Sequence, residues 1–341
     1  MQRWWSRLLW WSWALIVVLV LAMHLFGQRW WLVGGLVYAP PLMWIWFLAI
    51  IGLASWWMER KLAWVCLATM GILMGPLWEW RTHRPVFHRS VWQSPRTLRV
   101  LTANRGDHHG HSMADFVIQQ KPDVIAIQDA IYRQAYVPGS PEYAGLINQS
   151  RVGEFLLLSR YPIVKTQLLL TSLPPTPERP RNLQFKAARF EIDWHGQPVA
   201  IYSAHLPSPR QYIRKVVREP SALHLAQLKR HWAEHEAIIA DLTERIEADN
   251  LPVIVLGDWN QPPIGPNYRQ LIRKLQDAHT QAGLGYGASF PGDWWNPFTL
   301  GRVWMRLDLI LCSRQWQVLR SEAEPESETQ HCAVSAVLQL R

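Results

Sequence analysis

A short segment in the C-terminal half of the chain, VIVLGDWNQPP at residues 253–263, combines residue types that can do chemistry. Its apolar run predicts a buried strand, and Gly257, Asp258 and Asn260 follow at the strand end. A carboxylate and an amide at this spacing can hold a hard cation and place a phosphoryl oxygen or an attacking water beside it. Asp and Asn also form ordinary β-turns, so this segment alone fits a hydrolytic site and a plain turn equally well.

The same arrangement, an apolar strand bordered by a polar side chain, recurs along the C-terminal part of the chain. Strands are predicted at residues 98–102, 124–127, 154–159, 198–205, 252–258, 306–313 and 333–340. The polar residues at their boundaries are Asn104, Asp129, His205, Asp258, Asn260, Asp308 and His331. Either histidine alone would more often be structural than functional. A full set at successive strand boundaries favours one shared site instead.

Helices must connect and cover these strands. Met113, Phe116 and Val117 lie on one face of a predicted helix that Ser112 can cap. A longer helix is predicted at residues 222–248, where apolar residues recur at helical spacing. Strands interspersed with helices over about 245 residues indicate a single α/β domain in which helices cover the sheets.

This order of strands and polar residues resembles the endonuclease/exonuclease/phosphatase superfamily of metal-dependent phosphoesterases, over roughly residues 97–341. The segments that carry the resemblance are LRVLTANRG, DVIAIQDA, LLLSRYPI, YSAHLPSP, GDWN, RLDLILCS and ETQHCAVSAVL. The resemblance implies a DNase I-like fold, which is a four-layered α/β sandwich of two sheets flanked by helices. It also implies hydrolysis of a phosphodiester or a phosphomonoester, as in a nuclease or a phosphatase, with Mg²⁺ or Mn²⁺ as the cofactor.

The resemblance also assigns catalytic roles. Asp258 would orient or deprotonate the attacking water, and Asn260 and His205 would contact the phosphate of the substrate. Asp308 would orient His331, whose imidazole would stabilise the charge that develops on the phosphoryl oxygens.

The metal ligands implied by the resemblance are Asn104, Asp129 and Gln330, and two of them depart from the family pattern. Asp129 stands where the family has Glu, which withdraws the carboxylate by one methylene, about 1.5 Å. Gln330 stands where an Asp usually precedes the histidine. Mg²⁺ binding through Asp129 and waters is expected to persist, but more weakly. The alternative is a catalytically impaired member that acts as a membrane-tethered binding or scaffold module.

Other side chains are candidates for substrate contact on weaker grounds. Arg160, from the Ser-Arg pair, is expected to bind the substrate, and a structural ion pair fits its position equally well. The remaining candidates are the histidine-rich stretch 107–111, the loop arginines Arg179, Arg181 and Arg210, and the pair Trp294 and Trp295. Their positions in the sequence do not decide between substrate contact and a structural role.

The first eighty residues have a different chemistry, since 14 of the 22 tryptophans lie there. Uncharged apolar runs at residues 8–26, 30–57 and 62–78 are near the length that crosses about 30 Å of hydrocarbon. They predict a membrane domain of about three transmembrane helices at residues 1–80, followed by a linker at 81–97. Paired tryptophans at the ends of the runs fit the headgroup level. A cleaved signal peptide is the alternative for the first run, although two more runs follow it.

Charge divides the chain in the same way. The net charge is +9, of which residues 1–89 carry +6 and the remainder +3. Basic residues that flank apolar runs anchor membrane spans, so this excess is weak evidence for a nucleic-acid binder. A membrane tether favours a phospholipid or another lipid-linked phosphate, or a nucleic acid that arrives at the membrane. The expected location is multi-pass in the inner membrane of a bacterium, with the side of the catalytic domain left open.

Overall fold

Strands in the C-terminal domain form where apolar residues alternate between two covered faces. In β8 (Val253–Asp258), Val253 and Val255 face one layer of buried side chains, and Ile254 and Leu256 face another. Both faces of this strand are therefore covered by other parts of the chain. A strand buried on both faces reads as a continuous apolar run, as the letters VIVL do.

The computed structural model describes residues 2–81, 96–105, 113–130, 143–170, 185–291, 296–325 and 330–341. The other strands are β1 (Thr97–Asn104), β2 (Val124–Gln128), β3 (Asn148–Val152), β4 (Phe155–Ser159), β5 (Ile163–Leu170), β6 (Phe185–Trp194), β7 (Gln197–His205), β9 (Gln276–Asp277), β10 (Asp308–Cys312), β11 (Trp316–Ala323) and β12 (Val334–Leu340). The helices are α1 (Gln2–Leu25), α2 (Trp31–Gly34), α3 (Pro41–Trp56), α4 (Arg60–Ile72), α5 (Ala114–Gln120), α6 (Arg210–Arg218), α7 (Ala222–Glu247), α8 (Gly265–Ile272) and α9 (Ala278–Ala282).

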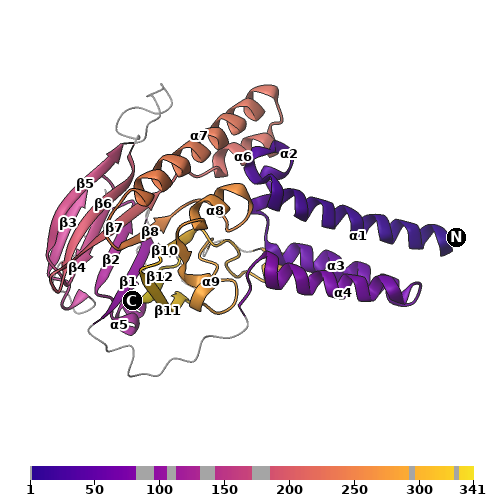
Figure 1. Ribbon diagram of the computed structural model, residues 1–341. Helices are drawn as coiled ribbons and strands as arrows, with labels where there is room; N and C mark the ends of the chain where they lie inside the picture. Colours follow the sequence, from indigo (N-terminus) through magenta and orange to yellow (C-terminus); the bar gives the residue numbers. More distant parts are fainter. Residues whose placement is uncertain are drawn as a thin grey trace.

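The strands form two six-stranded sheets (Figure 1). The strand order is β11-β12-β1-β2-β4-β3 in the first sheet and β5-β6-β7-β8-β10-β9 in the second. One pair in each sheet is parallel, β1 with β2 and β7 with β8, and the neighbouring pairs are antiparallel. Because parallel strands end at the same edge of a sheet, the polar residues that end these strands collect there.

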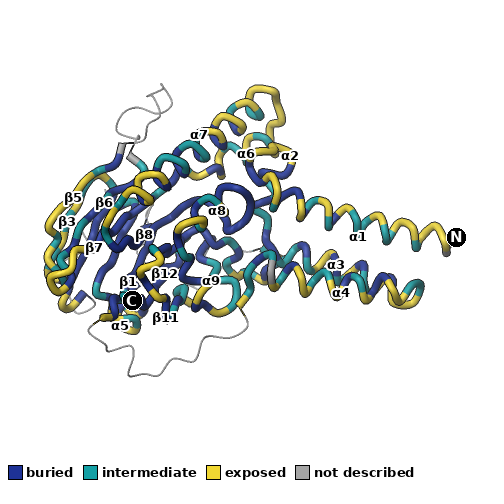
Figure 2. Tube along the Cα trace, viewed as in Figure 1, coloured by how far each residue is buried: buried dark blue, intermediate teal, exposed yellow. Residues whose placement is uncertain are grey.

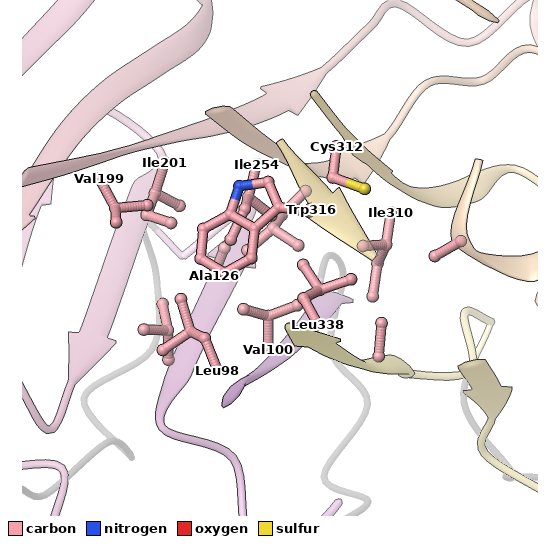
Figure 3. Close-up of a cluster of buried hydrophobic side chains, with 14 of the residues drawn as sticks. Leu98, Val100, Ala126, Val199, Ile201, Ile254, Ile310, Cys312, Trp316 and Leu338 are labelled. Atoms are coloured by element: carbon pink, nitrogen blue, oxygen red, sulfur yellow. The ribbon is translucent and has the colours of Figure 1, made fainter. Parts of the chain in front are cut away.

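The space between the two sheets is filled by apolar side chains from both of them (Figure 3). Val100 and Leu338 come from the first sheet, and Ile201 and Ile254 come from the second. Trp316 at the start of β11 is fully buried in the same cluster. Each such aliphatic side chain contributes about 1.5–3 kcal/mol when it leaves water, so this shared core holds the sheets together.

Helices cover the outer faces of both sheets. Ile239 and Leu242 of α7 pack on the second sheet together with residues of α8. Phe116 and Val117 of α5 pack on the first sheet. Figure 2 shows the buried strands between these helices, whose outer sides are exposed. The C-terminal domain is therefore an α/β sandwich of two sheets flanked by helices, as the sequence predicts.

The predicted elements correspond closely to observed ones. The seven predicted strands are β1, β2, β4, β7, β8, β10 and β12, and the long predicted helix is α7. The strands β3, β5, β6, β9 and β11 and the helices α6, α8 and α9 were not predicted. For β3 the reason is its sequence NQSRV, which is polar, and no residue of this strand is buried.

The N-terminal region holds fewer full-length spans than the three predicted. Within the described residues, α1 alone is a single helix long and apolar enough to cross a membrane. The helical stretch before Pro40 and α3 pass the same criterion only as a pair bent by 96°, because Pro40 and Pro41 start a new helix. The third run forms the 13-residue α4 and then a π-helical turn, Leu73–Leu77. The multi-pass location is therefore not supported, and α1 fits a membrane anchor or a signal sequence.

The N-terminal helices extend from one side of the C-terminal domain, with the N-terminus at their far end (Figure 1). Near their base, Nε2 of Gln28 donates to Oε1 of Gln261 at 2.9 Å. The hydroxyl of Tyr38 donates to the backbone oxygen of Asn260 at 3.1 Å. These bonds join the N-terminal segment to the loop that follows β8. Most of the predicted linker, residues 82–95, lies outside the described residues.

Candidate active site

The strand register brings three of the predicted site residues to one sheet edge. His205 ends β7 and pairs with Asp258, which ends β8. Asp308 begins β10 and pairs with Asp258 from the other side. Because β7 and β8 are parallel and β10 is antiparallel to them, the ends of two strands and the beginning of the third coincide. The two aspartates are each 1% exposed, so their carboxylates need polar partners.

Asp258 is the centre of a hydrogen-bond network. Its Oδ2 accepts from Nδ2 of Asn104 at 2.9 Å, and its Oδ1 accepts from the backbone nitrogen of Asn260 at 2.8 Å. The pKa of Asp258 is raised, chiefly because burial disfavours the charged carboxylate. His331 opposes this rise and Asp308 adds to it. A fixed carboxylate with a raised pKa is suited to accept a proton from water.

Asn260 holds Asp258 in place. Its Nδ2 donates to Oδ2 of Asp258 at 3.0 Å and to the backbone oxygen of Leu206 at 2.8 Å. Since an amide nitrogen carries two hydrogens, these two acceptors use both of them. Asn260 therefore orients Asp258, and its contact with the phosphate of the substrate stays a prediction.

Asp308 and His331 form the predicted carboxylate–imidazole pair. Nδ1 of His331 lies 2.9 Å from Oδ2 of Asp308, and its Nε2 lies 3.7 Å from Oδ2 of Asp258. The hydroxyl of Ser289 donates to the same oxygen of Asp308 at 2.7 Å, and the Phe290 ring lies 4.6 Å from the His331 ring. These contacts fix the imidazole so that Nε2 faces Asp258. A carboxylate held in this way fixes the tautomer and stabilises an imidazolium.

The backbone before Asp258 requires glycine. Gly257 has a φ of +150°, and a Cβ at this position would lie 1.9 Å from the backbone oxygen of Ala204 on β7. The close approach of the two strands at this point sets the direction in which the side chain of Asp258 leaves β8. Any side chain at position 257 must therefore push β8 away from β7.

Gly257→Ala is expected to lower the free energy of unfolding by about 3 kcal/mol, because it adds an atomic overlap to an unfavourable φ. For a domain of this size that corresponds to a Tm about 6–12 °C lower. The control is Gly196→Ala, because Gly196 also has a positive φ, +82°, but has open space around its Cβ position. Thermal unfolding in detergent checks both variants, and equal Tm shifts would show that the contact with β7 does not matter.

Glu154 belongs to the site although the sequence does not predict it there. Its Oε2 lies 3.0 Å from Nδ1 of His205. Its backbone oxygen accepts from the nitrogen of Ala130 at 2.9 Å, which ties this residue to the segment that follows β2. Burial lowers the pKa of His205, but the hydrogen bond and charge of Glu154 outweigh it, so the pKa is raised. The pair therefore favours an imidazolium at the site.

Glu154→Gln is expected to lower kcat/KM about 10- to 100-fold, because His205 loses the partner that orients and charges it. The same change should lower the pKa of His205 in an NMR titration, because the charge and hydrogen bond of Glu154 raise it. Glu244→Gln is the matched control, since Glu244 is exposed on α7. An unchanged His205 pKa in Glu154→Gln would contradict the assignment.

A cavity of about 740 Å³ opens beside Asp258 and His331. The three predicted metal ligands, Asn104, Asp129 and Gln330, also line it. Ligand atoms of Asp258, Asp308 and His331 all lie within 4.8 Å of one another. Oδ1 of Asp308 is buried and has no hydrogen-bond partner within the described part of the chain. A hard divalent cation held by Asn104, Asp129 and Gln330 in the same cavity would offset the cost of burying these carboxylates.

Arg160 does not lie with the other predicted site residues, and its substrate role stays a prediction. Its Nε lies 3.0 Å from Oδ1 of Asp123, so this side chain forms the structural ion pair that was the alternative. Strand β4 is antiparallel to β2, and Ser159 pairs with Val124. Arg160 therefore lies beside the beginning of β2, whereas the site lies at its end.

The remaining weaker candidates divide into two groups. Arg210, at the start of α6, lines the active-site cavity. The histidine-rich stretch 107–111 and the residues Arg179, Arg181, Trp294 and Trp295 lie outside the described residues.

Comparison with known proteins gives the family. Residues 98–331 match the Endonuclease/Exonuclease/phosphatase family, and a comparison with curated proteins gave no match. The structure is similar to an endonuclease/exonuclease/phosphatase from Beutenbergia cavernae, with 17% identity, a TM-score of 0.47 and 72% of each chain covered. It is also similar to a mannosyl-6-phosphatase from Bacteroides thetaiotaomicron, with 14% identity, a TM-score of 0.49, and 71% of this chain and 99% of that chain covered. Because the family match spans well over half of the sequence and includes the residues of the site, the chain belongs to the Endonuclease/Exonuclease/phosphatase family.

Proposed function

We propose that this protein is a metal-dependent phosphoester hydrolase, that is, a nuclease, a phosphodiesterase or a phosphatase. Its N-terminal helices anchor it in a membrane. The observation that carries the proposal is that Asp258 and His331 line one cavity, with His331 held by Asp308, in a chain of this family. Burying two carboxylates next to an imidazole destabilises the fold, and a binding module gains nothing that would offset this cost.

The residues of the site divide the work of hydrolysis. Asp258 orients a water molecule and accepts its proton as the water attacks phosphorus in line with the leaving group. His331, held by Asp308, stabilises the negative charge that develops on the phosphoryl oxygens. His205, held by Glu154, adds a second positive group at the same cavity.

The cation-binding residues are Asp129, with its carboxylate, and Asn104 and Gln330, with their amide oxygens. All three line the cavity that contains Asp258. Mg²⁺ or Mn²⁺ bound by them would supply positive charge for the phosphoryl oxygens. Because Asp129 is shorter than Glu and Gln330 is neutral, the affinity for the cation is expected to be lower than with Glu and Asp at these positions.

Exposed apolar side chains on the projecting helices support the membrane anchor. Leu15 and Val18 of α1 are 59% and 60% exposed, and Leu53 of α3 is 72% exposed. Figure 2 shows that such exposed positions continue along both helices. In water this surface would cost about 25 cal/mol for each Å² left uncovered, and lipid chains would remove that cost.

The test is hydrolysis of bis-p-nitrophenyl phosphate by the full-length protein in detergent, with Mg²⁺ or Mn²⁺ added back after chelation. Turnover is expected to disappear with EDTA and to return with either cation. In Asp129→Glu/Gln330→Asp the cation concentration for half-maximal rate is expected to fall about tenfold or more, because carboxylate charge and reach are restored.

The alternative function gives a different result in the same experiment. A binding or scaffold module would show no turnover at any cation concentration in the natural sequence. Turnover that appears only in Asp129→Glu/Gln330→Asp would mean that the natural protein has lost catalysis through these two positions. Turnover that survives EDTA would contradict the metal-dependent mechanism.

A further inference from the structure

A second cavity, of about 410 Å³, adjoins the active-site cavity. Six residues line both cavities: Ser208, Arg210, Arg214, Arg218, Asn260 and Phe290. The rest of the second cavity is largely apolar, and its side chains include Ile213, Val217, Trp304, Met305 and Leu307. We call this second cavity the apolar groove. A polar catalytic cavity therefore continues directly into a hydrocarbon-lined space.

Helix α6 forms the wall that both cavities share. The residues of α6 that line the groove are Arg210, Ile213, Arg214, Val217 and Arg218, which recur at the spacing of a single helix face. This face combines three arginines with two aliphatic side chains. Such a surface suits a ligand that has an anionic part and an apolar part.

The apolar residues of α6 have no role in the protein core. No residue of α6 is buried, and Val217 is 74% exposed. The helix is held on α7 from another side, where the Tyr212 and His231 rings stack with their centroids 4.6 Å apart. Ile213 and Val217 therefore remain available to cover something that is not part of the described chain.

The groove lies at the base of the projecting helices. Tyr38, which lines the groove, belongs to the 3-10 segment Leu36–Tyr38 before α3. Trp30 and Trp31, after the end of α1, are 41% and 40% exposed. Amphipathic aromatic rings of this kind settle at the headgroup level of a bilayer. With the helices in a membrane, the groove would face the lipid surface.

We infer that the substrate is a lipid phosphoester whose phosphate lies between His331 and the arginines of α6 and whose hydrocarbon chain lies in the apolar groove beside Ile213 and Val217. This inference rests on the proposed function, because it places the scissile phosphate at the same site. Guanidinium groups bind phosphate through charge-assisted hydrogen bonds, and the aliphatic wall removes the chain from water. A nucleic acid would use the arginines but would leave the apolar wall without a partner.

The test is binding of ethylphosphonate and octylphosphonate, which cannot be hydrolysed, to the full-length protein in amphipol. Each methylene that leaves water is worth up to about fourfold in affinity, so octylphosphonate is expected to bind about 100-fold more tightly or better. In Ile213→Gln/Val217→Gln that ratio is expected to fall to about tenfold or less, with the affinity for ethylphosphonate unchanged. Gln keeps the helix propensity of α6.

The matched control is Ile147→Gln/Val164→Gln, since these residues are 74% and 58% exposed and do not line the groove. It is expected to keep the wild-type ratio, which separates groove binding from partition of the octyl chain into the amphipol. If the ratio of the affinities for octylphosphonate and ethylphosphonate is the same in the two double variants, the inference is overturned. The inference would also be overturned, in favour of a nucleic acid, if an oligonucleotide displaces octylphosphonate and is hydrolysed while ethylphosphonate and octylphosphonate bind with equal affinity. If octylphosphonate binds more tightly than ethylphosphonate but no phosphoester is hydrolysed, the groove still binds a hydrocarbon chain and the proposed function is refuted.

Discussion

Asp258→Asn is expected to lower kcat/KM about 10³- to 10⁴-fold, because the amide cannot accept the proton of the attacking water. The fold should persist, since Asn has nearly the same shape and its amide oxygen, at the position of Oδ2, can still accept from Nδ2 of Asn104 and Nδ2 of Asn260. Only the backbone nitrogen of Asn260 loses its acceptor. The loss should appear mainly in kcat, because Asp258 acts on the water during attack rather than on the bound substrate. Steady-state hydrolysis of bis-p-nitrophenyl phosphate by the full-length variant measures it.

The control for this variant is Asp241→Asn, because Asp241 lies on α7 in an i,i+4 ion pair with Arg245 and away from the cavity. Its kcat/KM is expected to stay within about twofold of wild type, as an exposed pair contributes little. A loss of less than about tenfold in Asp258→Asn, with the fold intact, would remove Asp258 from the role of proton acceptor.

Asp308→Asn and His331→Asn are each expected to lower kcat about 10³-fold, and the double variant should be no worse than the poorer single variant. The reason is that the carboxylate acts only through the imidazole, with which it shares a 2.9 Å contact. Replacing the carboxylate by an amide removes the acceptor that fixes the tautomer, so Nε2 no longer faces Asp258 correctly.

A double-mutant cycle measures this coupling from the kcat values of the four proteins. Losses that simply multiply in the double variant would mean that Asp308 and His331 act independently. That result would contradict the carboxylate–imidazole pair, whatever the size of the individual losses.

The strand-end residues could be predicted from the sequence because the local pattern and the topology agree. The apolar run before Asp258 predicts β8, and Asp308 begins the next strand of the same sheet. The parallel pairing of β7 with β8 then places His205 beside Asp258 without any long-range information beyond the sheet order. The site therefore follows from a pattern that each strand carries by itself.

Strand direction and long-range packing explain the positions of Arg160 and Glu154, which the sequence does not reveal. Arg160 follows an apolar strand as the site residues do, but β4 is antiparallel to β2, so its end lies at the other edge of the sheet. Glu154 reaches His205 because the turn before β4 is tied to Ala130 by a backbone hydrogen bond. Neither fact is visible in the spacing of residues.

The geometry of the N-terminal helices and of α6 could not be predicted from the sequence, because composition does not reveal helix geometry. Counting uncharged residues joins α2 and α3 into one run, whereas Pro40 and Pro41 break it into a pair bent by 96°. Helix α6 was not predicted, because none of its residues is buried and it therefore has no apolar stripe that faces the core. A binding role for its arginines and aliphatic residues can be inferred only from the two cavities that they line.

The central claim is that this site directs water to phosphorus. The most direct test is hydrolysis of bis-p-nitrophenyl phosphate by the full-length protein with Mg²⁺ in ¹⁸O-labelled water, followed by mass spectrometry of both products. Attack on phosphorus predicts one labelled oxygen in the phosphate product and none in nitrophenol. Labelled nitrophenol, or no turnover by a folded protein with the cation present, would contradict the account.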